Sequence, residues 1–128
     1  MKLLLDTHLV LWAASAPERL SPTALELLES AANELVVSVV SFWEIVIKRG
    51  LGRDDFQVDP SRLRRGLRDN GWLELVLTSD HALAVERLPL LHKDPFDRML
   101  VAQSNVEGIV LLTADPLVSQ YPGSVEQV

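Results

Sequence analysis

Four acidic side chains have types and positions that suit a metal site: Asp6, Glu44, Asp97 and Asp115. Carboxylate oxygens are the protein ligands that Mg²⁺ and Mn²⁺ prefer, and such ions keep coordination positions open for a substrate phosphate. If the four carboxylates converged in a crevice of low dielectric, they would repel one another unless a cation lay between them. The acids therefore suggest a divalent-metal site, provided that the fold brings them together.

The elements that must position these acids alternate between strands and helices. Such alternation predicts an α/β domain with a mainly parallel central sheet. We expect strands over Lys2 to Asp6, Glu34 to Ser38, Leu73 to Leu77, Ile109 to Leu112 and, at an edge, Ser124 to Val128. We expect helices over Leu9 to Ala14, Pro22 to about Asn33, Ser41 to about Lys48, the residues after Pro60, Ser79 to about Leu88, Pro95 to about Glu107, and a last short helix from Asp115 and Pro116.

The predicted elements place all four acids at one edge of the sheet. Parallel sheets bind ligands at the carboxyl ends of their strands. Asp6 and Asp115 follow the first and fourth strands, while Glu44 and Asp97 each lie three residues into a helix. That location also suits helix caps, so each acid taken singly is equally well explained as a cap.

Capping boxes are the specific alternative for two of the acids. Ser41 to Glu44 and Asp94 to Asp97 both have the spacing of a capping box, in which the first side chain accepts a backbone N–H. We interpret Asp94 as a cap only and keep Asp97 in the candidate site.

Length and composition indicate one domain, spanning residues 1–128, with 48% apolar residues. The longest nearly apolar run, Leu35 to Trp43, is far shorter than the roughly 20 residues that span a bilayer. Asp6 and His8 interrupt the apolar start of the chain, so we expect no secretory leader and a cytoplasmic protein without a membrane segment. Without cysteine, a catalytic metal would be held by oxygen or imidazole ligands.

The charge is unevenly distributed along the chain. The formal net charge is −6, which argues against a nucleic-acid binder when taken alone. The segment from Lys48 to Arg68 nevertheless holds seven basic and three acidic residues. Within it, Arg62, Arg65 and Arg68 would share one face of a helix. RNA backbone contact, a solvated face and contact with an acidic partner are all open interpretations of this face.

Four ordered segments carry the acids: Leu4-Leu5-Asp6-Thr7-His8, Ser41-Phe42-Trp43-Glu44-Ile45 with Lys48, His92-Lys93-Asp94-Pro95-Phe96-Asp97-Arg98 continuing to Ala102-Gln103, and Leu112-Thr113-Ala114-Asp115. These segments resemble those of PIN-domain proteins, specifically the VapC-type toxins of bacterial toxin-antitoxin pairs. The resemblance covers nearly the whole chain. It implies a three-layer α/β/α sandwich and an endoribonuclease that depends on Mg²⁺ or Mn²⁺. It also implies a homodimer and a VapB-like antitoxin partner.

Carried over by position, the catalytic and metal-binding acids are Asp6, Glu44, Asp97 and Asp115, and none of them is substituted. Asp6 and Asp97, with Glu44 and Asp115 bound directly or through water, would hold one or two ions. Water activated by the metal would hydrolyse a phosphodiester and leave 5′-phosphate and 3′-hydroxyl ends. The resemblance further implies a structured RNA substrate, such as a tRNA or ribosomal RNA loop, whose cleavage would inhibit translation.

Polar neighbours of the acids are candidates for supporting roles. Thr7 and Thr113 could bond a carboxylate, a phosphate or the backbone, and Lys48 could pair with Glu44 or reach the substrate. We expect Lys93 and Arg98 to contact phosphate. The histidines at positions 8, 81 and 92 have no metal-ligand spacing and are interpreted as structural or surface residues.

The tryptophans at positions 12, 43 and 72 are interpreted as packing residues, with Trp12 the best placed to line a partner groove.

Other functions fit the sequence less well. A non-catalytic RNA- or protein-binding module remains the alternative, and it predicts that metal changes nothing. A phosphoryl-accepting receiver domain would need adjacent acids after the first strand and an aspartate after the third, which ends at Leu77-Thr78-Ser79. No glycine-rich nucleotide-binding loop occurs.

Overall fold

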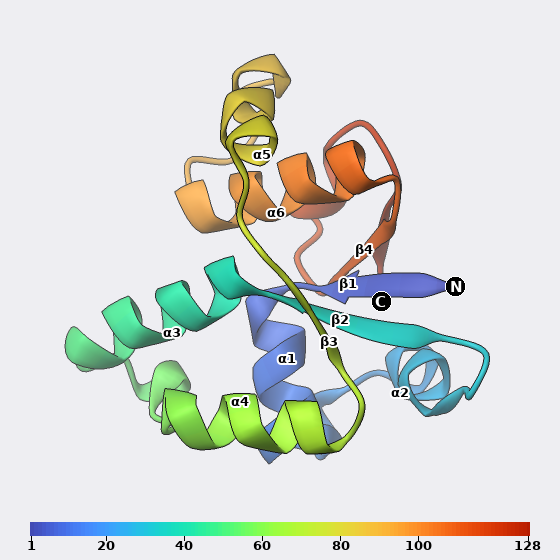
Figure 1. Ribbon diagram of the computed structural model, residues 1–128, viewed down its shortest axis with the longest axis vertical. Coiled ribbons are helices and arrows are strands. Elements are labelled where there is room, and N and C mark those ends of the chain that lie inside the picture. The colour runs from blue at the N-terminus through green and yellow to red at the C-terminus, as the bar shows by residue number, and fades with distance from the viewer.

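A five-stranded sheet forms the centre of the computed structural model, which describes residues 1–128 (Figure 1). The strands are β1 (Lys2–Leu5), β2 (Glu34–Ser38), β3 (Leu73–Leu75), β4 (Val110–Thr113) and β5 (Val125–Gln127). Their order is β3-β2-β1-β4-β5, and every neighbouring pair is parallel. The predicted parallel sheet is confirmed and extends to all five strands. Their carboxyl ends therefore meet at one edge.

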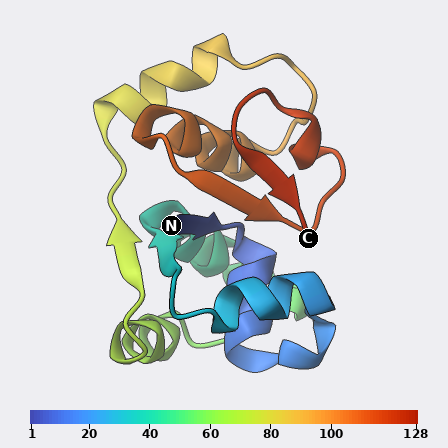
Figure 2. The ribbon, with the colours of Figure 1, turned by 90° about the vertical axis from the view of Figure 1, so that its right-hand side faces the viewer.

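Helices cover both faces of the sheet and give the predicted three layers (Figures 1 and 2). One face is covered by α1 (Thr7–Ser15), α2 (Pro22–Glu29) and α4 (Pro60–Asp69), and the other by α5 (Ser79–Ala84) and α6 (Pro95–Glu107). α3 (Val39–Gly50) leaves the end of β2 and contributes side chains to both layers. The length and hydropathy of these helices do not reach what a bilayer crossing requires.

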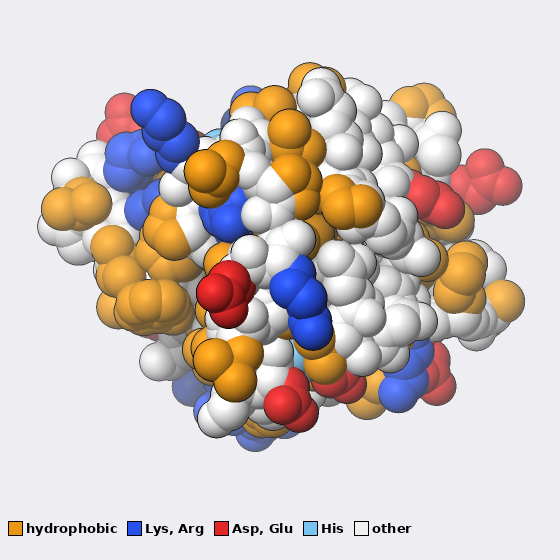
Figure 3. Space-filling model, turned by 90° about the horizontal axis from the view of Figure 1, so that it is seen from above, with side chains coloured by type: hydrophobic (Ala, Val, Ile, Leu, Met, Phe, Trp, Pro, Cys, Tyr) orange, Lys and Arg blue, Asp and Glu red, His pale blue; other side chains and the backbone are white.

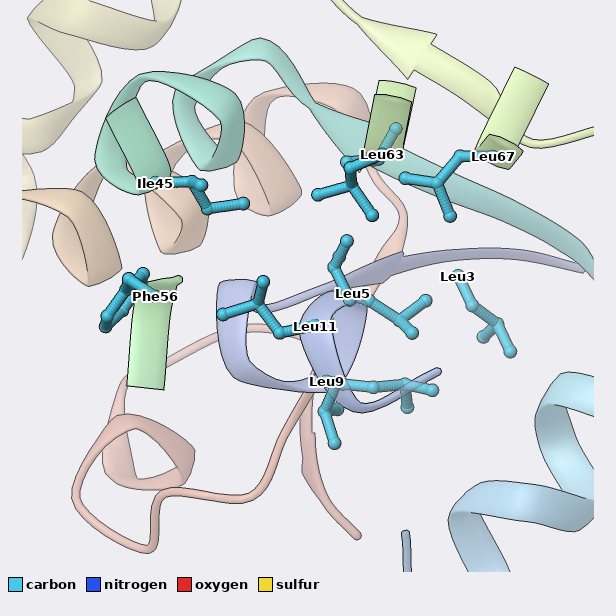
Figure 4. Close-up of a cluster of buried hydrophobic side chains, with 11 residues drawn as sticks. Leu3, Leu5, Leu9, Leu11, Ile45, Phe56, Leu63 and Leu67 are labelled. Atoms are coloured by element: carbon cyan, nitrogen blue, oxygen red, sulfur yellow. The ribbon is translucent and has the colours of Figure 1, made fainter. Parts of the chain in front are cut away.

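Alternate residues of the central strand face opposite layers, as the two-residue period of a strand requires. Leu3 and Leu5 of β1 lie in a cluster with side chains of α1, α3 and α4, whereas Leu4 packs against α5 and α6. Figure 4 shows Leu63 and Leu67 of α4 facing the first cluster. Burial of each large aliphatic side chain stabilises the fold by about 1.5–3 kcal/mol. This packing fixes where the end of β1 lies.

The start of α3 differs from its prediction. The helix begins at Val39 and not at Ser41, because Ser38 at the end of β2 is the N-cap and its hydroxyl accepts the Val40 N–H at 3.0 Å. Ser41 lies inside the helix, which excludes the alternative that Glu44 forms a capping box with it. Glu44 is consequently free of the backbone and available to other side chains.

α5 begins at Ser79, as predicted, but its N-cap is Thr78 and not Ser79. The Thr78 hydroxyl accepts the His81 N–H at 3.3 Å, and His81 Nδ1 accepts the Thr78 N–H at 3.1 Å. Histidine here takes the part that Glu or Gln usually has in a capping box, which hid the signal. α5 is also shorter than predicted and continues as a 3₁₀ turn at Val85–Arg87.

The last predicted helix is likewise a 3₁₀ turn, at Val118–Gln120, and it starts later than predicted. Asp115 precedes it in a turn where its Oδ1 accepts the Leu117 N–H at 2.8 Å.

α6 has the boundaries that its sequence predicts. Asp94 is the N-cap, and its Oδ1 accepts the N–H groups of Phe96 and Asp97 at 2.8 and 3.2 Å. Pro95 occupies the first helical position, and Gly108 ends the helix with φ 67°. The interpretation of Asp94 as a cap is confirmed, and this cap fixes Asp97 in the first turn.

Two glycine substitutions are expected to change stability in opposite directions. Gly66 lies in the exposed interior of α4, and the space that an added methyl group would fill is open, so Gly66→Ala should stabilise the protein by about 0.5–1 kcal/mol. Gly108 has a left-handed backbone, so Gly108→Ala should destabilise it by about 1 kcal/mol. Urea denaturation of both variants measures the two shifts. Equal shifts would contradict the assigned backbone conformations.

Candidate functional site

Asp6 lies at the end of β1, with only 4% of the residue exposed. Its Oδ1 accepts the Leu9 N–H at 2.9 Å, so Asp6 is the N-cap of α1. Its Oδ2 accepts the Thr113 hydroxyl at 2.5 Å. Burial raises the pKa of Asp6 above its usual value, although these hydrogen bonds act to lower the pKa. The carboxylate is therefore held by neutral donors in an environment that disfavours its charge.

Glu44 lies on α3, is 2% exposed, and uses both carboxylate oxygens. Oε1 accepts the Thr7 hydroxyl at 2.5 Å, and Oε2 is 2.5 Å from Lys48 Nζ. Thr7 Oγ1 also lies 3.0 Å from the Ser41 hydroxyl. Lys48 lies one turn after Glu44 on the same helix and pairs with it. This pairing is one of the two alternatives predicted for Lys48, the other being contact with the substrate.

Asp97 lies in the first turn of α6, and about 20% of its side chain is exposed. Burial, followed by the charges of Asp94, Glu44, Asp6 and Asp115, raises its pKa to about 8. Every other member of the predicted quartet thus acts on Asp97 electrostatically. The ligand atoms of His92, Asp97 and Asp115 lie within 4.8 Å of one another, whereas Asp6 and Glu44 act on Asp97 through their charges.

His92 connects two of these acids. Its Nε2 lies 3.5 Å from Asp97 Oδ2 and 3.4 Å from Asp115 Oδ2. Nδ1 accepts the Asp94 N–H at 3.0 Å, so the neutral ring carries its proton on Nε2. His92 therefore faces the carboxylates as a donor, although His92, Asp97 and Asp115 are also close enough together to hold an ion.

His92 was not predicted from the sequence to contact Asp97 and Asp115. Its position three residues before Pro95, inside the segment that carries Asp97, was the available signal.

Lys48 is the one cationic side chain with contacts to acids of two helices at this site. Besides Glu44, its Nζ lies 3.5 Å from Asp94 Oδ2. The ammonium also lies 4.9 Å from the ring centroid of Phe56 and 5.4 Å from that of Phe96. Burial alone would lower the pKa of Lys48, but the hydrogen bond and charge of Glu44, with Asp94, outweigh it and raise the pKa. Lys48 therefore stays charged.

The donor set fits a hard divalent cation. Asp6, Asp97 and Asp115 offer oxygen atoms, and no lysine or arginine pairs with any of them. Apart from His92, no side chain pairs with the Asp97 carboxylate. A divalent cation would stabilise the ionised form of Asp97, which its acidic neighbours disfavour. Of the predicted supporting residues, Thr7 donates to Glu44 and Thr113 donates to Asp6, so both hydroxyl groups bond carboxylates and not only the backbone.

Two other predicted neighbours lie differently. Arg98 donates to the carbonyls of Pro89 and Val85 at 2.8 and 3.3 Å and to the Tyr121 hydroxyl at 3.2 Å. These bonds direct its guanidinium to the loop before α6, and the expected phosphate contact of Arg98 stays a prediction. Lys93 is exposed and has no ion pair, so its phosphate contact stays a prediction.

Trp43, interpreted from the sequence as a packing residue, is 56% exposed beside the site, and only its edge-to-face contact with Phe96 orients it.

Thr113 offers a test of how the site is held together. Thr113→Val removes the donor to Asp6 and leaves the Asp115 N–H, which the hydroxyl accepts at 3.0 Å, without its partner. We expect a loss of about 1–3 kcal/mol in the free energy of unfolding with the fold retained. Urea denaturation in a chelator, with Ser119→Ala as a surface hydroxyl control, measures this loss. An unchanged stability would contradict the assigned hydrogen bonds.

A groove of about 870 Å³ lies away from the acids, between α1, α2 and α4. Leu25, Leu28, Leu63 and Trp72 line it, and Arg62 stands among its polar residues. Trp12 was expected to line a partner groove, but Trp72 and not Trp12 lines this one. On the same basic helix, Arg64 donates to Glu74 at 2.6 and 3.1 Å. Part of the basic charge of α4 is thus neutralised within the chain.

Solved structures with a similar fold are toxin-antitoxin complexes. VapBC2 from Rickettsia felis, bound to a DNA fragment from the promoter, has a TM-score of 0.72 at 14% identity, covering 99% of this chain and 98% of that one. A toxin-antitoxin complex from Klebsiella pneumoniae has a TM-score of 0.64 at 16% identity, covering 98% and 99%. VapBC-1 from nontypeable Haemophilus influenzae has a TM-score of 0.64 at 15% identity, covering 99% and 98%.

Sequence comparisons match nearly the whole chain. Ribonuclease VapC22 from Mycobacterium tuberculosis (strain ATCC 25618 / H37Rv) is 27% identical over 121 residues, which cover 88% of this chain and 85% of that protein. The family model described as PIN domain matches residues 3–123, a range that contains β4 and all four acids. With its parallel three-layer fold and this match, the chain belongs to the PIN domain family.

Proposed function

We propose that this chain is a metal-dependent endoribonuclease of the VapC type, the toxin of a toxin-antitoxin pair. The observation that carries this proposal is the convergence of Asp6, Glu44 and Asp115 on Asp97, whose pKa they help to raise to about 8. Structural proteins have little use for so many acids at one strand edge, whereas a metal-dependent nuclease requires them. The named ribonuclease and toxin-antitoxin relatives support this choice.

In this proposal the four carboxylates hold one or two Mg²⁺ or Mn²⁺ ions. The metal, when bound, supplies the positive charge that activates water and stabilises the leaving oxygen of a phosphodiester. Thr113 and the Leu9 N–H orient Asp6, and Thr7 orients Glu44. His92 presents an N–H at the outer side of Asp97 and Asp115, where it can donate to a phosphate oxygen.

The substrate that we propose is an unpaired loop of a structured RNA, such as a tRNA or ribosomal RNA, whose cleavage inhibits translation. Single-stranded loops expose their bases and backbone to a site of this kind more readily than duplexes do. Lys93, in the segment that leads into α6, is the residue that we expect to contact a phosphate.

A VapB-like antitoxin is the partner that we propose for the groove between α1, α2 and α4. The groove has an apolar lining, and the fold neighbours are complexes of toxins with antitoxins. An apolar segment of the antitoxin would cover Leu25, Leu63 and Trp72, while an acidic residue would pair with Arg62. Cytoplasmic location follows from the same proposal, because its RNA substrates and translation are there.

A second copy of the chain is the partner that we propose for the exposed side of α3. Val39, Trp43 and Val46 are spaced as one helical stripe and are 37%, 56% and 54% exposed. Figure 3, which views the molecule from the side of α5, shows hydrophobic side chains gathered in several places on this face. Exposed apolar patches of this kind mark interfaces, so we propose a homodimer.

Incubation with total cellular RNA tests the proposed activity. Antitoxin-free protein with Mn²⁺ should produce discrete fragments, and their ends should be 5′-phosphate and 3′-hydroxyl. Fragments with 2′,3′-cyclic phosphate ends would contradict hydrolysis by activated water. Intact RNA that comigrates with the protein would instead indicate the non-catalytic binding module.

A further inference from the structure

Lys48 divides the acidic site into two unequal parts. Its ammonium lies against Glu44 and Asp94, at 2.5 and 3.5 Å. The nearest donors of Asp6, Asp97 and Asp115 are backbone N–H groups, a hydroxyl group and the His92 imidazole. One part of the site therefore holds the permanent positive charge of a lysine, and the other contains no lysine or arginine.

The position of the Lys48 ammonium is fixed by several contacts. Only 14% of the side chain is exposed, and the ammonium lies near the faces of Phe56 and Phe96, which belong to different elements. Glu44 in turn cannot move away, since Thr7 holds its other oxygen. Asp94 is fixed by its own role as the cap of α6. Lys48 is thus held between α3 and α6 at a constant place.

We propose that the Lys48 ammonium occupies the position that a second metal ion would take, so that the site binds one divalent ion, at Asp97 and Asp115, whose ligand oxygens lie within 4.8 Å of each other. This inference rests on the proposed function and deepens it. A second divalent ion near Nζ would be repelled by the ammonium, and the repulsion is stronger for a divalent ion than for a unit charge. This refines the four-carboxylate site proposed above, because Glu44 then positions Lys48 and is not a direct ligand of the ion.

An ordinary salt bridge within a helix would have no such consequence. A pair at positions i and i+4 contributes only a few tenths of a kcal/mol and would not alter how many ions bind nearby. If Lys48 replaces an ion, removing its charge frees Glu44 Oε2 and Asp94 Oδ2, two oxygens that both lie within 3.5 Å of the vacated place. Oxygen ligands placed in this way are suitable for a second Mn²⁺.

The number of bound Mn²⁺ ions tests the proposal without measuring activity. Titration calorimetry and electron paramagnetic resonance of Mn²⁺ count ions per chain for the wild type, Lys48→Met, Lys48→Arg and Arg49→Met. Methionine keeps the length of the buried stem and removes its charge. Arg49 is the matched control, because it is the next residue, is exposed and carries the same charge.

We expect one ion per chain for the wild type, Lys48→Arg and Arg49→Met, and two for Lys48→Met, with a spectrum broadened by the coupling of two neighbouring Mn²⁺ ions. Circular dichroism verifies the fold, and Lys48→Gln replaces Lys48→Met if that variant does not fold. Two ions in the wild type, or one in the uncharged variant, would overturn the inference and leave the proposed function intact. No ion in the wild type would overturn the metal-dependent function itself.

Discussion

Replacement of Asp97 by asparagine is expected to abolish RNA cleavage and, unlike most substitutions at buried sites, to stabilise the metal-free protein. Cleavage should fall by at least roughly 100-fold, because a carboxylate that faces the metal is lost. Stability should rise because the pKa of Asp97 is about 8 in the folded protein, against a usual value of 3.8. At neutral pH Asp97 is ionised in the unfolded chain but must take up a proton on folding, which costs folding free energy, and asparagine carries no such cost.

The pH dependence of this effect follows from the raised pKa. Asp97 keeps its proton more firmly in the folded state, so its contribution to stability is complete below about pH 4 and is lost as the pH rises towards 8. The stability gained by Asp97→Asn should thus be absent at pH 4 and reach a few kcal/mol at pH 8, on the scale of about 1.4 kcal/mol per pKa unit.

Asp59→Asn is the matched control for Asp97→Asn, because it makes the same change of an aspartate at the start of a helix. Asp59 is the N-cap of α4 and lies outside the site. Asparagine is an equally good cap, so this variant should retain both activity and stability. Urea denaturation in a chelator from pH 4 to 8 gives the comparison. A metal-free Asp97→Asn protein that is less stable than the wild type at pH 8 would contradict the convergence of the acids.

Addition of Mn²⁺ is expected to raise the melting temperature of the wild type, and more so at pH 8 than at pH 6. A ligand at 100 times its Kd stabilises the folded state by about 2.7 kcal/mol. The metal binds the ionised carboxylates, so at pH 6 it must displace the proton of Asp97, which reduces its apparent affinity. Asp97→Asn should lose most of this response.

Thermal melting with Mn²⁺, Mg²⁺ and chelator at both values of pH measures the response, with Asp59→Asn again as the control. A shift of the same size at pH 6 and pH 8 would mean that Asp97 does not titrate on metal binding.

The elements around the site were predictable where the signals are local. Asp94, Pro95 and Gly108 mark the two ends of α6 by their backbone preferences alone, and the structure places them as predicted. The apolar strands and their alternation with helices likewise predicted the parallel sheet. That topology was sufficient to bring the four acids together, because parallel strands share one carboxyl edge.

Tertiary contacts explain what the sequence did not predict. Arg98 was expected at a phosphate because it follows Asp97, but on a helix adjacent residues point in different directions, and Arg98 reaches Pro89, Val85 and Tyr121. Trp43 stands in an apolar run, yet its place on the outer side of α3 leaves it exposed.

His92 shows the same limit most clearly. Its role depends on the Asp94 N–H, which fixes the proton on Nε2, and on Asp115, which comes from a distant part of the chain. Neither relation is visible as a spacing of histidines. Lys48, by contrast, could be paired with Glu44 from their separation of four residues, whereas its contact with Asp94 depends on the packing of α3 against α6.

Comparison of RNA cleavage by the wild type, Asp6→Asn, Asp97→Asn and Asp59→Asn, each with Mn²⁺, Mg²⁺ or chelator, tests the central claim most directly. We predict discrete fragments from the wild type and Asp59→Asn with either metal, and intact RNA from both site variants and from every sample with chelator. Fragments that persist in chelator, or that both site variants still produce, would contradict a nuclease that acts through metal held by these acids.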